Sequence, residues 1–183
     1  MIEGFRCGYV ALIGRPNVGK STLLNRLVGE KLAITSPKPQ TTRYRLLGIL
    51  HLAGAQLLFL DTPGLLDPKG LLNESLVKAA LAALADADVV VWLVEPRPPD
   101  FQDRTVLPRV QALKCPIVIA INKIDLVDKP QLLPLIAAYH DFFPESPVVP
   151  LAAFLGDGLP TLVTEIVQLL PVSPPLFPEE QLT

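Results

Sequence analysis

Residues 14 to 21 read GRPNVGKS and match the whole of the pattern G-x-x-x-x-G-K-[S/T]. They stand between an apolar run, Gly8–Ile13, and a segment of helical composition, Ser21–Val28. Glycine near both ends of the pattern lets the backbone bend so that successive N–H groups face inward and bind an anion. This spacing predicts a phosphate-binding loop at a helix N-terminus, whose partial positive charge adds to the attraction.

The side chains of this loop have separate tasks on a nucleotide. Lys20 is placed to neutralise β- and γ-phosphate oxygens, and the hydroxyl of Ser21 is a candidate Mg²⁺ ligand. The candidate nucleotide-binding residues here are Gly14, Arg15, Pro16, Asn17, Val18, Gly19, Lys20, Ser21 and Thr22.

The tetrapeptide Asn122-Lys123-Ile124-Asp125 directly follows the apolar run Pro116–Ile121. The carboxyl ends of parallel strands share one rim, so these side chains should lie near the phosphate loop. The Asp125 carboxylate can accept from both N1–H and N2–H₂ of guanine, a pair of donors that adenine lacks. The stem of Lys123 can lie along the base, and Asn122 can contact N7 and tie loops together. The alternative is an ordinary polar turn after a strand.

Two further segments supply candidate residues for Mg²⁺ and the γ-phosphate. Asp61 closes the apolar run Gln56–Leu60 and should face the Mg²⁺ shell, while the N–H of Gly64 suits a γ-phosphate oxygen. In the aperiodic loop Lys31–Thr42 the candidate second hydroxyl ligand is Thr42, with its neighbour Thr41 as the alternative. Turn chemistry and a plain polar loop are the competing interpretations.

The elements that position these residues follow from hydrophobic periodicity. Continuous apolar runs predict buried parallel strands at 8–13, 56–60, 89–94, 116–121 and 147–151, and the mixed segment 44–52 predicts an edge strand. Helices are expected at 21–28, 74–84 with Asn73 as N-cap, 102–113, 131–142 and 159–170. Pro108 should kink the third of these helices or end a turn of it. Strands alternating with helices predict a three-layer α/β domain.

Composition excludes several other classes of protein. The chain has 183 residues, 19% of them charged, and a net charge of −2, which leaves no electrostatic footprint for tight nucleic-acid binding. We find no apolar run of membrane-spanning length and no signal peptide, so we expect a cytoplasmic protein. Cys7 and Cys115 are expected to be free, buried thiols.

The motifs GRPNVGKS, PQTTR, DTPG and NKID, in this order and spacing, resemble the Era-like branch of the translation-factor-related GTPases. The C-terminal LFPEEQLT resembles the segment that joins the GTPase domain of the Era family to an RNA-binding KH domain. The resemblance implies a P-loop NTPase fold with a mixed six-stranded, mostly parallel sheet, and Mg²⁺-dependent hydrolysis of GTP to GDP. It also implies a role in small ribosomal subunit maturation through 16S rRNA, and peripheral inner-membrane association in some members.

On this basis we expect a monomeric GTPase domain over residues 1–170 and a Pro-rich linker over 171–183. The KH domain to which that linker would lead has no counterpart in this sequence, so any RNA role belongs to that further part.

The sequence departs from the family at the loop that supports guanine. The family's Ser-Ala is replaced by Ala152-Ala153, followed by Phe154, so a supporting hydroxyl is lost. The resemblance implies that O6 of the base is met by the N–H of Ala153, a contact that needs no particular side chain.

Leu65 follows Gly64, where Ras-like relatives carry a glutamine that orients the attacking water. Catalysis then rests on Lys20, Thr42, Gly64 and Asn17, and we predict slow intrinsic turnover. The side-chain oxygen of Asn17 is a candidate K⁺ ligand, the alternative being a bond within its own loop.

Three functions compete. The first is a GTPase, the second a nucleotide-gated binding module with little hydrolysis, and the third a P-loop ATPase or kinase, which the Asn-Lys-x-Asp pattern opposes. Another Era-like GTPase of ribosome assembly or tRNA modification is a variant of the first.

Overall fold

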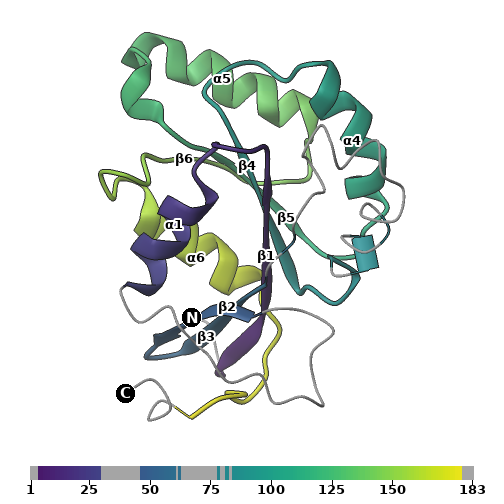
Figure 1. Ribbon diagram of the computed structural model, residues 1–183, viewed down its shortest axis with the longest axis vertical. Coiled ribbons are helices and arrows are strands. Elements are labelled where there is room, and N and C mark those ends of the chain that lie inside the picture. Colours follow the sequence, from purple (N-terminus) through teal and green to yellow (C-terminus); the bar gives the residue numbers. More distant parts are fainter. Residues whose placement is uncertain are drawn as a thin grey trace.

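A six-stranded sheet forms the centre of the computed structural model, in the order β2-β3-β1-β4-β5-β6 (Figure 1). Only the pair β2 and β3 is antiparallel, and the other neighbours in the sheet are parallel. The mixed, mostly parallel six-stranded sheet implied by the family resemblance is therefore confirmed. The strands are β1 (Arg6–Gly14), β2 (Leu46–Leu52), β3 (Ala55–Leu60), β4 (Val89–Val94), β5 (Ile117–Ile121) and β6 (Val148–Pro150).

The structure describes residues 4–29, 46–60, 62, 78, 81–82 and 84–178. Its helices within these ranges are α1 (Lys20–Val28), α4 (Phe101–Gln111), α5 (Lys129–Phe142) and α6 (Leu159–Leu169), with a short 3₁₀ turn η1 (Ile124–Leu126). Most of the helix expected at 74–84, including Asn73, lies outside the described residues. None of the described helices has the length and apolarity needed to cross a bilayer.

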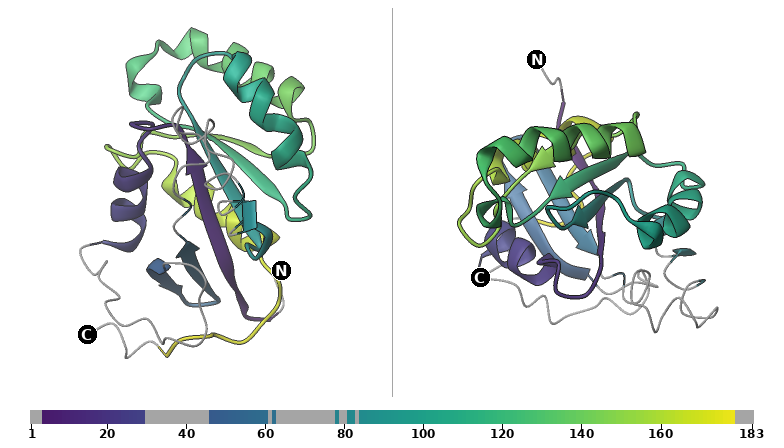
Figure 2. Two further views of the ribbon diagram at one scale, coloured as in Figure 1. Left: turned by 45° about the vertical axis from the view of Figure 1, so that its right-hand side comes forward. Right: turned by 90° about the horizontal axis from the view of Figure 1, so that it is seen from above.

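The helices cover both faces of the sheet, which is why its central strands are apolar throughout. Strands β3, β4 and β5 are buried along their whole lengths. Along β1, Val10 and Leu12 pack toward α1 and α6, whereas Ala11 and Ile13 pack toward α4 and α5 (Figure 2). The three-layer α/β arrangement expected from the sequence is thus present, with an apolar core on each side of the sheet.

Helix α4 contains Pro108, which was expected to kink the helix or end a turn. Pro108 does not end the helix, which continues to Gln111. Proline removes a single N–H donor, while its own carbonyl still accepts from the N–H of Ala112 at 3.1 Å. The buried side chains of Val106 and Val110 hold both sides of the proline against the sheet.

The described part of the Pro-rich C-terminal segment, residues 171–178, lies along the sheet. Val172 forms an antiparallel bridge with Arg6, and Phe177 packs over an apolar cluster that includes Cys7 and Leu58. The side-chain amide of Gln56, at 0% exposure, bonds the backbone of this segment: Oε1 accepts from the N–H of Leu176 and Phe177, and Nε2 donates to the Phe177 carbonyl. The segment is therefore extended and docked.

Candidate nucleotide-binding site

The phosphate loop connects the carboxyl end of β1 to the start of α1, where the sequence predicts it (Figure 1). Asn17 and Gly19 adopt positive φ angles of 64° and 109°. Gly19 is the N-cap of α1 and provides no capping side chain, and the first helical hydrogen bond runs from the N–H of Leu23 to the carbonyl of Gly19 at 2.9 Å. The N-terminal end of a helix carries a partial positive charge, so the start of α1 is suited to an anion.

Close packing explains why Gly19 must be glycine. A Cβ at this position would lie 2.2 Å from Nδ2 of Asn122, in addition to the strain of its positive φ. Gly14 is also confined, since a Cβ there would lie 2.9 Å from the carbonyl oxygen of Leu93. Both glycines of the motif are thus required by contacts of the loop with β4 and with the turn after β5.

Lys20 and Ser21 occupy the first turn of α1. The Nζ of Lys20 donates to the carbonyl of Gly14 at 2.7 Å and so reaches back across the loop. Ser21 is exposed, which leaves its hydroxyl at the surface of the helix start. A neutral hydroxyl beside an anion-binding helix start fits Mg²⁺, which prefers oxygen ligands and shares them with phosphate.

Asn122 joins two loops of the site. Its buried side chain donates from Nδ2 to the carbonyl of Val18 at 2.9 Å, and its Oδ1 accepts from the N–H of Ala153 at 2.9 Å. Lys123, at a φ of 61°, donates from Nζ to the carbonyl of Asn17 at 2.7 Å. The tetrapeptide and the phosphate loop are therefore neighbours on one rim, as predicted, and the exposed side chain of Asp125 lies on the same short turn.

The hydrogen bond of Ala153 bears on an expectation drawn from the family resemblance. The resemblance implies that its N–H faces O6 of the base, but here it is engaged with Asn122 Oδ1. An N–H has a single hydrogen to offer, so a guanine O6 would have to share this donor with Asn122 or replace it as the acceptor. The contact between Ala153 and O6 remains a prediction.

Two hydrogen bonds to other parts of the chain hold the loop around Ala152, which lacks the serine hydroxyl of the family. The N–H of Ala152 donates to the carbonyl of Asp157 at 2.9 Å, and the guanidinium of Arg26 on α1 donates to the carbonyl of Phe154. Sequence reasoning missed Arg26, because a basic residue on an exposed helix face is common. Its partner lies 128 residues away along the chain.

The side chain of Arg15 does not point into the phosphate loop. Its Nη1 donates to Asp100 Oδ2 at 2.8 Å, and its Nη2 donates to Asp103 Oδ1 at 3.1 Å. The guanidinium of Arg15 holds the pKa of Asp100 well below its usual range, chiefly through this hydrogen bonding. Arg15 can therefore contribute its backbone, but not its guanidinium, to phosphate binding in this arrangement.

Three predicted residues, Thr42, Asp61 and Gly64, lie outside the described residues. So do Thr41 and Leu65. The described neighbours of Asp61 are both fixed beside β1: Leu60 pairs with Ala11, and the Thr62 hydroxyl donates to the carbonyl of Leu12 at 2.6 Å.

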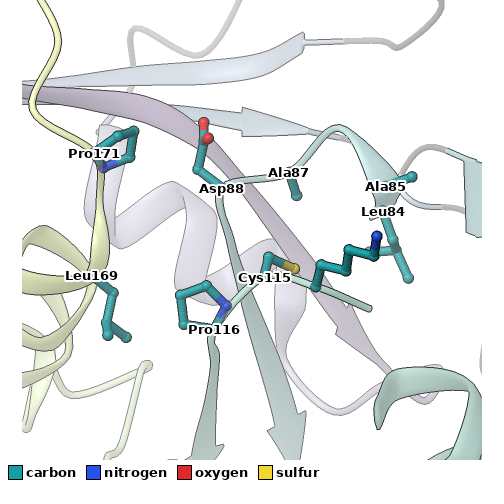
Figure 3. Close-up of a pocket in the computed structure, with 9 residues that line it drawn as sticks. Leu84, Ala85, Ala87, Asp88, Cys115, Pro116, Leu169 and Pro171 are labelled. Carbon is teal, nitrogen blue, oxygen red and sulfur yellow. The ribbon is translucent and has the colours of Figure 1, made fainter. Parts of the chain in front are cut away.

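A hollow of about 350 Å³ lies at the opposite ends of the strands from the phosphate loop, before β4 and β5 (Figure 3). Asp88, Cys115, Pro116 and Leu169 are among its lining residues. Asp88 accepts from the backbone N–H of Tyr9 at 2.7 Å, and burial raises the pKa of the Cys115 thiol. A raised pKa disfavours the thiolate, which is the nucleophilic form of cysteine. Cys7 is buried and Cys115 half-buried, and both are free.

A phosphate loop after the first strand, tied through Asn122 to an Asn-Lys-x-Asp turn after β5, defines a P-loop nucleotide-binding domain of the GTPase type. The chain belongs to the family described as 50S ribosome-binding GTPase, which matches residues 9–123.

Similarity to individual proteins extends over nearly the whole chain. It is 47% identical over 182 residues to GTPase Era of Geotalea daltonii, a match that covers 99% of this chain and 61% of that protein. A crystal structure of Era in complex with MgGDPNP and nucleotides 1506–1542 of 16S ribosomal RNA is 42% identical, with a TM-score of 0.81, over 96% of this chain and 61% of that one. A point variant of Aquifex aeolicus Era bound to GDP·AlF₄⁻ gives a TM-score of 0.80 at 42% identity, with the same coverage of both chains. The chain thus spans about 61% of the length of these relatives.

Proposed function

We propose that this domain binds guanine nucleotides together with Mg²⁺ and hydrolyses GTP to GDP and phosphate. The observation that carries the proposal is the double hydrogen bond of Asn122 to Val18 and Ala153. It brings the phosphate loop, the turn carrying Asp125 and the loop 152–156 to one rim, where a nucleoside triphosphate can contact all three. The relatives bound to MgGDPNP and to GDP·AlF₄⁻ support the same chemistry.

Each group then has a physical task. The N-terminal end of α1 and the ammonium of Lys20 bind the phosphates and neutralise charge that develops on the β–γ bridge. Ser21, with Thr42 and Asp61, would hold Mg²⁺, which when bound supplies further charge neutralisation at the phosphate oxygens. We assign the N–H of Gly64 to a γ-phosphate oxygen.

Base selection is the sharpest test of this proposal. Fluorescent GTP and ATP analogues are titrated against the wild-type chain, and equal affinity for both would overturn the choice of guanine. The variant Asp125→Asn should lose affinity for GDP and gain affinity for XDP, because an amide can donate to the O2 of xanthine where the carboxylate cannot. Retained preference for GDP in this variant would remove Asp125 from base recognition.

Hydrolysis is proposed to be slow, because Leu65 stands where a water-orienting glutamine would otherwise be found.

We further propose that the exposed Asn17 helps to bind K⁺ beside the phosphates. Turnover should then be faster in KCl than in NaCl, and Asn17→Ala should abolish the difference. Equal rates in both salts would overturn the K⁺ site. Nucleotide-dependent binding of a partner without measurable turnover would instead favour the nucleotide-gated binding module.

We propose that in a longer, Era-type protein this domain is the switch for small ribosomal subunit maturation through 16S rRNA. The relative bound to nucleotides 1506–1542 of that RNA supports this role. With a net charge of −2, this chain should bind the RNA weakly by itself. An oligonucleotide of that sequence is titrated at fixed salt, and tight binding by this chain alone would assign the RNA site to the GTPase domain.

The resemblance to the Era-like GTPases suggests a cytoplasmic location with peripheral membrane association, which cell fractionation tests.

A further inference from the structure

Arg15, the second residue of the phosphate-loop motif, makes a forked contact with the start of α4. Its Nη1 donates to Asp100 Oδ2 at 2.8 Å, its Nη2 donates to Asp100 Oδ1, and Nη2 also reaches Asp103 Oδ1 at 3.1 Å. The side chain of Arg15 is 22% exposed and that of Asp103 is 5% exposed. Forked, partly buried contacts of this kind fix geometry as well as contributing energy.

The two carboxylates already have a role in α4. Asp100 is the N-cap and accepts from the N–H of Asp103 at 3.0 Å, while Asp103 accepts from the N–H of Asp100 at 2.8 Å. This reciprocal capping box immobilises both side chains, so they form a rigid acceptor for Arg15. Helix α4 is in turn packed on the sheet through Val106 and Val110.

A second arginine uses the same acceptors from outside the loop. Nη1 of Arg97 lies 3.2 Å from Asp100 Oδ2 and 3.2 Å from Asp103 Oδ2, and its side chain is 29% exposed. Arg97 belongs to the connection between β4 and α4. The two arginines thus resemble each other in partners and exposure, but only Arg15 connects those partners to the phosphate loop.

We propose that Arg15 is a positioning residue for nucleotide binding: it anchors the first turn of the phosphate loop to the cap of α4 and leaves phosphate contact to the loop backbone and Lys20. This inference rests on the proposed nucleotide binding. The anchor orders residues 15–19 before a nucleotide arrives, so less ordering remains to be done on binding. It acts on GDP and GTP alike, because it touches neither the γ-phosphate nor the base.

In the alternative role, the guanidinium of Arg15 is a phosphate ligand that its hydrogen bonds to Asp100 keep away from the phosphates. The two roles predict opposite effects on nucleotide affinity when Asp100 is changed. Asp100→Ala should weaken nucleotide binding if Arg15 is an anchor, because the guanidinium loses its two hydrogen bonds to Asp100 and keeps only the one to Asp103. If Arg15 is a restrained phosphate ligand, the same variant should bind nucleotide more tightly and turn over faster.

The test compares Arg15→Ala, Arg15→Lys, Asp100→Ala, the double variant of Arg15 and Asp100, and Arg97→Ala in the full chain. Arg15→Ala should weaken GDP and GTP-analogue binding equally, by about tenfold, since the loss of charged hydrogen bonds is of this order. The turnover number should stay within about twofold, and Arg15→Lys should recover part of the affinity because it keeps the charge without the fork. The double variant should be no worse than Arg15→Ala.

Arg97→Ala is the matched control for effects on α4 alone, and its nucleotide affinity should stay within about twofold of wild type. In nucleotide-free protein, amide hydrogen exchange over residues 15–19 should rise in Arg15→Ala and not in Arg97→Ala. The anchor role would be overturned if Arg15→Ala and Arg97→Ala lost the same amount of nucleotide affinity, or if Arg15→Ala kept the wild-type affinity. Tighter nucleotide binding by Asp100→Ala would also overturn it. Failure of the wild type to bind nucleotide overturns the proposed function instead, and the exchange measurement still decides whether Arg15 orders the loop.

Discussion

The side-chain amide of Asn122 donates a 2.9 Å hydrogen bond to the carbonyl of Val18, across 104 residues of sequence. This bond fixes the phosphate loop, which follows β1, against the turn that follows β5. Strand β4 lies between those two strands, so no ladder hydrogen bond joins their ends directly. One buried side chain therefore sets the spacing between the phosphate and base ends of the proposed site.

Asn122→Ala should weaken GDP binding and lower the free energy of unfolding together. The Val18 carbonyl and the Ala153 N–H would both lose a partner, at about 1–3 kcal/mol for each buried group. Isothermal titration with GDP and urea unfolding measure the two effects. Asn122→Asp keeps the shape of the side chain but places a carboxylate oxygen against the Val18 carbonyl, so it should also lower both the GDP affinity and the free energy of unfolding. Wild-type affinity in either variant would contradict the bridging role.

Gly19→Ala should abolish tight nucleotide binding, because the new Cβ would lie 2.2 Å from Nδ2 of Asn122. Gly29→Ala is the matched control: Gly29, with a φ of 74°, also needs glycine, but among the described residues no atom beyond its chain neighbours lies within 4 Å of a Cβ there. It should cost only backbone strain, about 1–3 kcal/mol of stability, and keep its nucleotide affinity. Similar affinity losses in the two variants would show that strain, rather than contact with Asn122, matters at Gly19.

Gln56→Leu should release the C-terminal segment from the sheet. The buried leucine would leave the N–H groups of Leu176 and Phe177 without their acceptor, each of which lies within 3.1 Å of Gln56 Oε1. Hydrogen exchange measured by mass spectrometry should speed up over residues 172–177 and stay slow in β4. Unchanged protection of the segment would show that its apolar contacts through Phe177 hold it without Gln56.

Tyr139→Phe should raise the free energy of unfolding by up to about 1 kcal/mol. The hydroxyl of Tyr139 is fully buried and has no hydrogen-bond partner among the residues that the structure describes, so its removal relieves a desolvation cost. Burial also raises the pKa of this phenol, so its ionisation plays no part near neutral pH. Tyr139→Ala, the control that removes the ring, should cost about 3–5 kcal/mol. A destabilised Tyr139→Phe would reveal a hydrogen bond made by the hydroxyl.

Acid should destabilise the domain partly through Asp100. Its folded-state pKa is lowered from the ordinary 3.8, mainly by the hydrogen bond from Arg15. A lowered pKa means that the stabilisation is complete above the ordinary value and is lost as pH falls below about 4. Urea midpoints from pH 6 to pH 3 should fall less steeply in Asp100→Asn than in wild type. Parallel curves would show that other carboxylates account for the acid sensitivity.

The sequence alone determined the local features of this protein. Apolar runs predicted β1, β3, β4 and β5, and the motif GRPNVGKS predicted a loop before α1, because periodicity and glycine spacing act on neighbouring residues. The Asn-Lys-x-Asp turn was also correctly placed on the rim of the phosphate loop, since parallel strands end at one edge of the sheet.

The tertiary structure decided which partners the polar side chains take. Arg15 was predicted with the phosphate loop, yet its guanidinium binds Asp100, 85 residues away, and the N–H of Ala153 bonds Asn122. The docking of residues 171–178 on Gln56 could likewise not be predicted, because the Pro-rich sequence indicates only an extended segment. These pairings form only when separate strands and helices pack together, and no local pattern records which distant donor will face which buried acceptor.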